Sequence, residues 1–279
     1  MLESDYFLTR DGLRLPLRHW DAAHPRAIVV ALHGMSDYSN AFDMPASWWG
    51  EHGITTYAYD QRSFGRSPDP GIWPGGDALR QDLDDCVDAV RKQHPGLPVF
   101  ALGESMGGAV VLSALAAPSP PRVDGVILVA PAVWAREDMP VSYRLALWLT
   151  AHTVPWLRLT GRGLNIWPSD NIEMLKKLSR DPLFQKETRA DAVWGLVDLM
   201  DAARKAPGRL PPDPPPILLD YGAHDQIIPR APTEAVIRAL GPRVEAHEYP
   251  KGYHMLLRDL DGPSVWKDIQ TWIDQHIRA

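Results

Sequence analysis

The chain has 279 residues, of which 45% are hydrophobic and 23% charged, and its formal net charge is −6. This length allows one large α/β domain or two small ones, with a sizeable core in either case. The acidic balance argues against nucleic acid as a partner, because there is no basic patch to neutralise phosphates. The single cysteine, Cys86, excludes an internal disulfide, and we interpret it as a structural thiol.

The sequence shows no targeting or membrane-spanning segment. Residues 1–9 lack the basic stretch and following apolar run that are typical of a signal peptide. No stretch approaches the ~20 apolar residues of a transmembrane helix. We therefore predict a cytoplasmic protein.

The first half of the chain predicts a hairpin followed by alternating strands and helices. Two strand-like segments, 6–9 and 13–20, flank the turn sequence Asp11-Gly12. Buried strands are predicted over 27–32, 55–59, 99–103 and 125–130, and helices over 45–51, 77–93 and 106–117. This alternation predicts a parallel sheet with helices on both faces.

The helix predicted over 77–93 carries the densest run of charge in the chain, Asp82 to Asp88. Apolar residues recur through it with helical spacing, at Leu79, Leu83, Val87 and Val90. We expect these apolar residues to face the core and the acidic residues of the run to face water.

The segment Gly103-Glu104-Ser105-Met106-Gly107 lies between a predicted strand and a predicted helix. A serine on such a sharp turn has a strained backbone, and the residues two positions away must be small enough for the chain to pass itself. Glycines stand at both of these positions. Ser105 is therefore the candidate nucleophile. The Met106 amide, at the start of the helix, is a candidate donor to an oxyanion.

The loop His33-Gly34-Met35 follows the strand predicted over 27–32. Open α/β sheets bind ligands at the carboxyl ends of their strands. In a serine hydrolase this loop supplies a second oxyanion amide, which we assign to Met35. We interpret His33 as a structural turn residue, and the polar loop 60–67 as a packing element that buttresses the site.

The alternation stops after Pro131. Residues 133–206 contain helical patterns at 141–150, 171–178 and 191–205 but no strand-like run. We expect this insertion to cover the catalytic loops as a helical cap, giving core residues 1–132, cap residues 133–210 and core residues 211–279. The candidates for substrate contact in it are Trp134, Leu145, Trp148 and Leu149.

The apolar residues of the insertion have three interpretations. They would pack the cap onto the core, line a pocket for an acyl chain, or contact a membrane surface transiently. Inward and outward orientations give the same sequence pattern, so the sequence leaves these alternatives open.

The last part of the chain returns to strands, at 217–221 and 244–249, and helices, at 233–240 and 265–277. A serine nucleophile needs a histidine to take its proton and a carboxylate to orient that histidine. Asp225 and His254 lie in the loops after these two strands and supply both roles. Asp220 is the nearest rival acid, but it lies within a strand. No metal-ligand cluster or phosphate-binding loop competes, so we expect no metal and no cofactor.

At these residues the chain resembles the α/β-hydrolase superfamily, and more narrowly the monoacylglycerol lipase and lysophospholipase-like serine hydrolases. The matching segments are His33-Gly34, Asp60-Gln61-Arg62 with Gly65 and Ser67, residues 103–108, Gly222 with Asp225 and Pro229, and Gly252 with His254. The resemblance implies an α/β-hydrolase fold with a mostly parallel eight-stranded sheet, an N-terminal antiparallel hairpin and a helical cap. It also implies Ser105 as nucleophile, His254 as base, Asp225 as its orienting acid, and the Met35 and Met106 amides as the oxyanion hole.

The chain departs from this lipase pattern at three places. Ser63-Phe64 stands where these lipases usually have Gly-His, and Glu104 stands where they have a histidine before the serine. Met255 follows the catalytic histidine, where an acid is common. None of the three positions belongs to the predicted triad.

We therefore predict a serine carboxylic ester hydrolase whose partner is a small-molecule acyl ester, such as a monoacylglycerol or a lysophospholipid. A serine aminopeptidase of the same fold is one alternative, with Glu137, Asp138 and Glu173 as the carboxylates that would hold a substrate amine. A non-catalytic ligand-binding module is another, because a fold does not fix a function.

Overall fold

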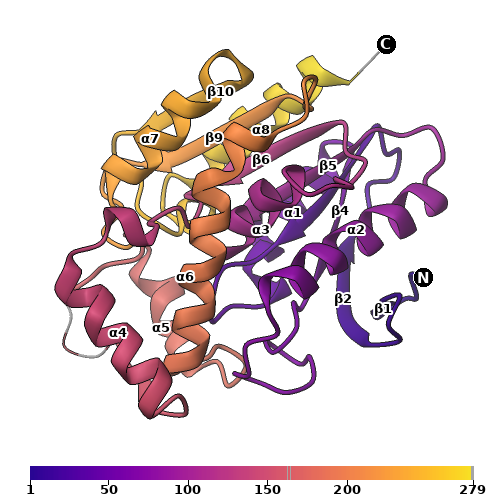
Figure 1. Cartoon of the computed structure of the whole chain (residues 1–279). Coiled ribbons are helices and arrows are strands. Elements are labelled where there is room, and N and C mark those ends of the chain that lie inside the picture. The colour runs from indigo at the N-terminus through magenta and orange to yellow at the C-terminus, as the bar shows by residue number, and fades with distance from the viewer. Residues whose placement is uncertain (162, 164, 278–279) are drawn as a thin grey trace.

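A computed structural model describes residues 1–161, 163 and 165–277. Arg162, Leu164 and residues 278–279 belong to the predicted ranges but lie outside the described residues. An eight-stranded sheet runs through the molecule in the order β1-β2-β4-β3-β5-β6-β9-β10 (Figure 1). The strands are β1 (Tyr6–Leu8), β2 (Arg14–Trp20), β3 (Ala27–Leu32), β4 (Ile54–Tyr59), β5 (Val99–Glu104), β6 (Gly125–Val129), β9 (Ile217–Gly222) and β10 (Val244–Tyr249).

The sheet is antiparallel at one edge and parallel elsewhere. β1 pairs with β2, and β2 with β4, in antiparallel register. The other five pairings, from β4 through to β10, are parallel. Every residue of β3, β4, β5 and β6 is buried, as expected for parallel strands covered on both faces. The predicted hairpin and the mostly parallel sheet are confirmed.

Helices cover both faces of this sheet (Figure 1). They are α1 (Asp43–Glu51), α2 (Gly76–Gln93), α3 (Met106–Leu115), α7 (Arg230–Leu240) and α8 (Gly262–His276). Alternate residues of β3 divide between the two layers: Ile28 and Val30 pack with α2, α3 and α7, whereas Val29 and Ala31 pack with α1 and α8. This period of two is the side-chain alternation of a β-strand.

Residues 133–210, which we call the insertion, lie between β6 and β9 and contain α4 (Val141–Thr153), α5 (Ile172–Arg180) and α6 (Ala190–Lys205). α6 packs on α3 with Val197 and Met200, and α4 lies outside it (Figure 1). The insertion also holds a two-stranded sheet, β7 (Arg158–Leu159) with β8 (Thr188–Arg189). The expectation of helices alone was wrong here, because strands of two residues are too short to leave a periodic pattern.

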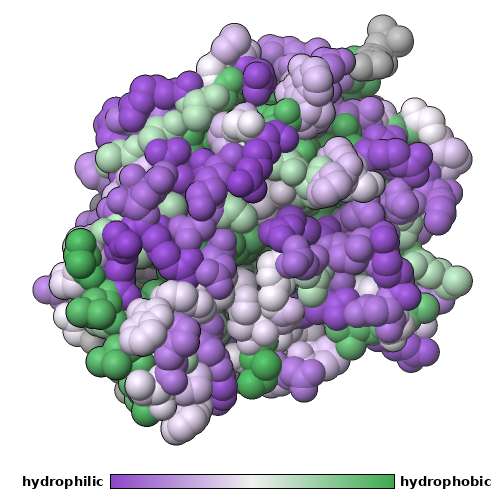
Figure 2. All heavy atoms as spheres, in the orientation of Figure 1, coloured by the Kyte–Doolittle hydropathy of each residue, from purple (hydrophilic) through white to green (hydrophobic). Residues whose placement is uncertain are grey.

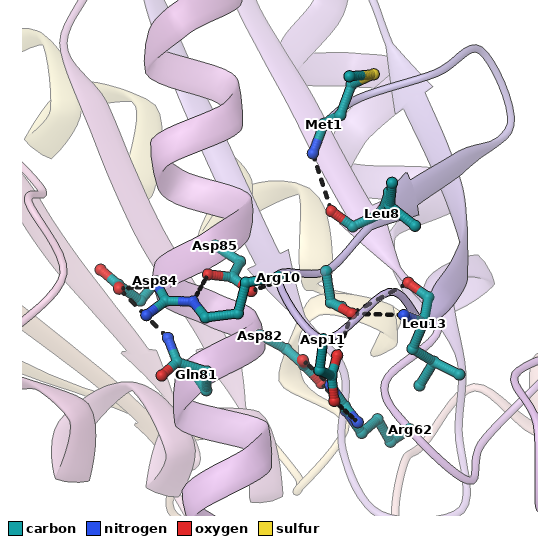
Figure 3. Close-up of polar contacts among 11 residues, drawn as sticks. Met1, Leu8, Arg10, Asp11, Leu13, Arg62, Gln81, Asp82, Asp84 and Asp85 are labelled. Atoms are coloured by element: carbon teal, nitrogen blue, oxygen red, sulfur yellow. Dashed lines mark hydrogen bonds and ion pairs between the residues drawn. The ribbon is translucent and has the colours of Figure 1, made fainter.

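The burial of Asp82 also differs from the prediction that the acidic residues of this helix face water. Its side chain is fully buried, and its carboxylate accepts hydrogen bonds from Arg62, which also pairs with Asp11 of the hairpin turn (Figure 3). Burial raises the pKa of Asp82 to about 6. Asp84 and Asp85 bind Arg10 at the surface instead. Helical spacing places Asp82 on the polar face, but the partner that makes its burial possible lies 20 residues earlier in the chain.

Among the residues that the structure describes, no helix combines the length and the hydropathy that a membrane crossing requires. Cys86 lies on the buried face of α2, where desolvation raises the pKa of its thiol well above the ordinary value. Its burial agrees with a structural thiol.

Candidate active site

Ser105 occupies the turn between β5 and α3, with φ 54° and ψ −116°. Its amide donates to the Val129 carbonyl at 2.9 Å, which fixes the turn to the neighbouring strand. The chain passes itself closely here: a Cβ atom added to Gly107 would lie 2.1 Å from the Leu32 carbonyl oxygen, and one added to Gly103 would lie 2.3 Å from the Gly107 oxygen. Two glycines therefore make the strained turn possible.

His254 lies between Ser105 and Asp225. Its Nε2 is 2.9 Å from the Ser105 Oγ, and its Nδ1 is 2.8 Å from the Asp225 Oδ2. The Asp225 Oδ1 accepts from the amides of Ile227 and Ile228 at 2.8 and 2.9 Å, which holds the carboxylate in place. With the Nδ1 proton donated to Asp225, Nε2 is free to accept the serine proton. The structure thus brings together the three side chains that the sequence predicts to form the triad, Ser105, His254 and Asp225.

Asp220, the rival acid, does not contact His254. It is fully buried on β9, and its Oδ1 lies 3.3 Å from the Nδ1 of His247 on β10. Burial raises the pKa of Asp220 to about 6, and the contact of the His247 ring with the Asp220 carboxylate raises the pKa of His247 to about 9. Asp220 therefore belongs to a separate ion pair.

The loop after β3 approaches the serine closely. A Cβ atom added to Gly34 would lie 3.1 Å from the Ser105 Cβ. Within the part of the chain that the structure describes, no backbone carbonyl accepts a hydrogen bond from the amide of Met35 or of Met106. One of these donors lies in the loop after β3 and the other at the start of α3, directly after Ser105.

His33 is buried and has a structural role. Its Nε2 accepts from the Gln61 amide at 3.0 Å, and its Nδ1 donates to the Gly34 carbonyl at 2.8 Å. Because Nε2 accepts a hydrogen bond, the ring is neutral, and burial, which lowers the pKa of His33, favours the same state. These bonds tie the loop after β3 to the loop 60–67, as expected for a buttress.

The four substrate-contact candidates differ in exposure. Trp134 is half-buried against the core, whereas Leu145, Trp148 and Leu149 on α4 are 63%, 48% and 53% exposed. Figure 2 shows hydrophobic side chains gathered at the lower left, over α4. Other exposed apolar residues of the insertion are Val141, Tyr143, Val154, Trp156, Leu157, Leu159, Ile166, Trp167 and Ile172.

The sequence patterns did not predict the individual contacts between the insertion and the catalytic loops. The Met255 amide donates to the Pro168 carbonyl at 2.8 Å, and the Ser169 hydroxyl donates to Asp259 at 2.6 Å. The Gln185 amide donates to the Ser36 carbonyl, also at 2.8 Å. The insertion is therefore bound directly to the histidine loop and to the loop after β3.

Within residues 1–161, 163 and 165–277, no group of three or more His, Cys, Asp or Glu side chains is arranged to hold a metal ion.

Comparison with known proteins adds to this geometry. The family model described as "Serine aminopeptidase, S33" matches residues 23–261. The monoacylglycerol lipase of Mycolicibacterium smegmatis is 27% identical, over 95% of each chain. The human monoglyceride lipase is 25% identical, over 97% of this chain and 90% of that one. The solved structure of a soluble variant of the Saccharomyces cerevisiae monoglyceride lipase, in complex with a substrate analog, superimposes with a TM-score of 0.84 at 20% identity, covering 99% of this chain and 96% of that one. The chain belongs to this S33 family of serine hydrolases and is an α/β-hydrolase similar to the monoacylglycerol lipases.

Proposed function

We propose that this protein hydrolyses lipid-like carboxylic esters, monoacylglycerols above all, through an acyl-serine intermediate. The observation that carries the proposal is the continuous hydrogen-bonded series from Asp225 through His254 to Ser105, at 2.8 and 2.9 Å. The similarity to monoacylglycerol lipases over nearly the whole chain supports the substrate class. A lysophospholipid offers the same acyl ester and is the second substrate to test.

The geometry supports a two-step mechanism. The Ser105 oxygen attacks the ester carbonyl carbon while His254 Nε2 takes the hydroxyl proton, and Asp225 stabilises the resulting imidazolium. The carbon–oxygen bond to glycerol then breaks, and the alcohol leaves with the proton from Nε2. In the second step His254 takes a proton from a water molecule, whose oxygen attacks the acyl carbon. The bond from this carbon to the Ser105 oxygen then breaks, Nε2 returns the proton to that oxygen, and the fatty acid leaves.

The amides of Met35 and Met106 are proposed as the oxyanion hole. During each attack the ester carbonyl oxygen gains negative charge, and two preformed donors stabilise it without reorganising. Gly34 brings the first donor's loop against Ser105, and the start of α3 supplies the second. The positive end of the α3 dipole acts in the same direction.

The insertion is proposed as a cap that brings the enzyme to lipid. The exposed face of α4 carries Leu145, Trp148 and Leu149, and an apolar patch of this kind suits partition into a lipid surface. Trp134, which is half-buried beside the core, is the remaining candidate for contact with the acyl chain. The proposed division is core 1–132, cap 133–210 and core 211–279.

The carboxylates that an aminopeptidase would use already have partners. Arg204 lies 3.4 Å from Glu137 and from Asp138, and Lys176 lies 2.7 Å from Glu173. A carboxylate paired with a cation of its own protein is a poor site for a substrate amine. This favours esters over peptides.

The test is hydrolysis of p-nitrophenyl esters from acetate to palmitate, with monoacylglycerol and lysophosphatidylcholine alongside and Ser105→Ala as the control. We expect activity to peak at medium or long chains and to vanish in the variant. Equal activity across all chain lengths would contradict the lipid substrate. A wild type that is inert on esters yet labelled at Ser105 by a fluorophosphonate would direct the search to peptides, and one that is not labelled would support a binding module.

A further inference from the structure

Glu104, directly before the nucleophile, has no role in the mechanism above. Along β5 the side chains of Phe100 and Leu102 face the layer of α1 and α8, so strand alternation places Glu104 on that same face. There it is buried, with only 2% of its surface exposed. A carboxylate in such a position needs a partner.

Arg258 provides that partner. It ends the short helix Leu256–Arg258, four residues after His254, and it too is buried. Its Nη2 lies 3.3 Å from the Glu104 Oε2 and 2.6 Å from the Oδ2 of Asp37, a buried acid in the loop after β3. One guanidinium on the histidine loop thus binds acids from the two segments that carry Met35 and Ser105.

The charges of this cluster depend on one another. The buried carboxylates of Asp37 and Glu104 both contact the Arg258 guanidinium. Without this cation they would repel each other, because the protein interior screens charge weakly. Burial raises the pKa of Glu104, and the charge of Arg258 opposes that rise. The guanidinium therefore links the histidine loop to both segments at once and offsets the repulsion between their two acids.

We propose that Arg258 is a positioning residue for ester hydrolysis, which holds the Met35 loop and the Ser105 turn in register with His254. The inference rests on the proposed function, because it assigns the Met35 amide to the oxyanion hole. It also gives a role to Glu104, the buried acid directly before the nucleophile, which pairs with Arg258.

The first test is Arg258→Met. Displacing catalytic groups by about 1 Å costs on the order of 100-fold in rate, so we expect kcat on a short p-nitrophenyl ester to fall about 10- to 100-fold. We expect KM for this small ester to change by less than about threefold, because Arg258 does not bind substrate. Arg258→Lys keeps the positive charge but changes the length and the planar geometry of the donor group, and it should recover part of kcat.

Arg10→Met is the matched control. Arg10 also binds two carboxylates, Asp84 and Asp85, but it joins the hairpin turn to α2, outside the loops that surround the site. Its loss should leave kcat of the folded enzyme near the wild-type value. If Arg258→Met fails to fold, Arg258→Gln, which keeps a hydrogen-bond donor, gives the same test. A wild-type kcat in a folded Arg258 variant would overturn the proposal, as would an equal loss of kcat in the Arg10 control.

The rate of Ser105 labelling by a fluorophosphonate separates this inference from the proposed function. Labelling needs the nucleophile, the base and the oxyanion donors, but no ester substrate. Slower labelling in Arg258→Met supports the positioning role even if the wild type hydrolyses none of the esters. Ester hydrolysis and labelling that both proceed at wild-type rates in Arg258→Met would overturn the positioning role and leave the proposed function standing.

Discussion

His254 Nε2 lies 2.9 Å from Ser105 Oγ, although 149 residues separate the two in the chain. The parallel sheet produces this contact, because β5 and β10 both end at the same edge and each is followed by a loop. Asp225 comes to the same edge from β9. The hydrogen bonds that connect Asp225, His254 and Ser105 need all three loops in place. A single substitution in one loop therefore tests the whole catalytic arrangement.

The first prediction distinguishes Asp225 from Asp220. Asp225→Asn removes the charge that stabilises the imidazolium and favours the wrong tautomer, so kcat should fall by roughly 10⁴-fold while the fold persists. Asp220→Asn should leave kcat within a few-fold, because Asp220 contacts His247 and not His254. Steady-state kinetics on one ester, with circular dichroism of both variants, tests this. A large loss of kcat in Asp220→Asn alone would show that the assignment is reversed.

The second prediction concerns pH and the pair Asp220–His247. The folded-state pKa of His247 is about 9, above its ordinary value of 6.5, since Asp220 favours the protonated ring. A raised histidine pKa stabilises the fold fully below pH 6.5, and this contribution is lost as the pH rises towards 9. Asp220, with a pKa of about 6, is mostly ionised at pH 7 and above, so His247→Gln should lower the melting temperature more at pH 7 than at pH 9.

Thermal unfolding of both proteins across this pH range gives the comparison. The wild-type curve contains every other titrating group, so the difference between wild type and His247→Gln isolates the pair. His247 also lies 3.0 Å from the exposed Glu245, which adds to the same trend. A difference in melting temperature that stays constant from pH 7 to pH 9 would contradict the prediction.

The third prediction concerns the close passage at the nucleophile turn. Gly107→Ala would bring a methyl group to 2.1 Å from the Leu32 carbonyl oxygen, so the backbone must move. We expect a loss of about 1–3 kcal/mol of folding free energy and a loss of Ser105 labelling. Gly208→Ala is the control, because a Cβ atom there meets no described atom within 4 Å. Denaturant unfolding measures both, and equal stability of the two variants would count against the tight turn.

The fourth prediction tests the exposed face of α4. In Leu145→Ser/Leu149→Ser, activity on monoacylglycerol in phospholipid vesicles should fall, while kcat on soluble p-nitrophenyl acetate stays unchanged. Burying a leucine contributes about 1.5–3 kcal/mol, so vesicle binding measured by sedimentation should weaken at least about tenfold. Met44→Ser, on the exposed part of α1, is the control. Unchanged vesicle binding in the double variant would exclude α4 as the lipid-binding face.

The sequence by itself determined the parallel sheet and the set of candidate catalytic residues. Both leave local patterns: apolar runs of strand length, helical spacing, and glycines two positions on either side of Ser105. The choice of Asp225 and His254 also followed from local position, since each lies in a loop after a strand. The cytoplasmic location and the absence of a cofactor stay predictions.

Only the tertiary structure decided the contacts between distant segments. It buried Asp82 beside Arg62, paired β7 with β8, and placed Arg258 between Asp37 and Glu104. It also showed that Leu145, Trp148 and Leu149 lie at the surface. The spacing of apolar residues in the sequence does not tell whether they face the protein or the solvent. The physical reason is the same in each case. Burial of a charge or an apolar side chain depends on what faces it, and the facing residue here comes from another part of the chain.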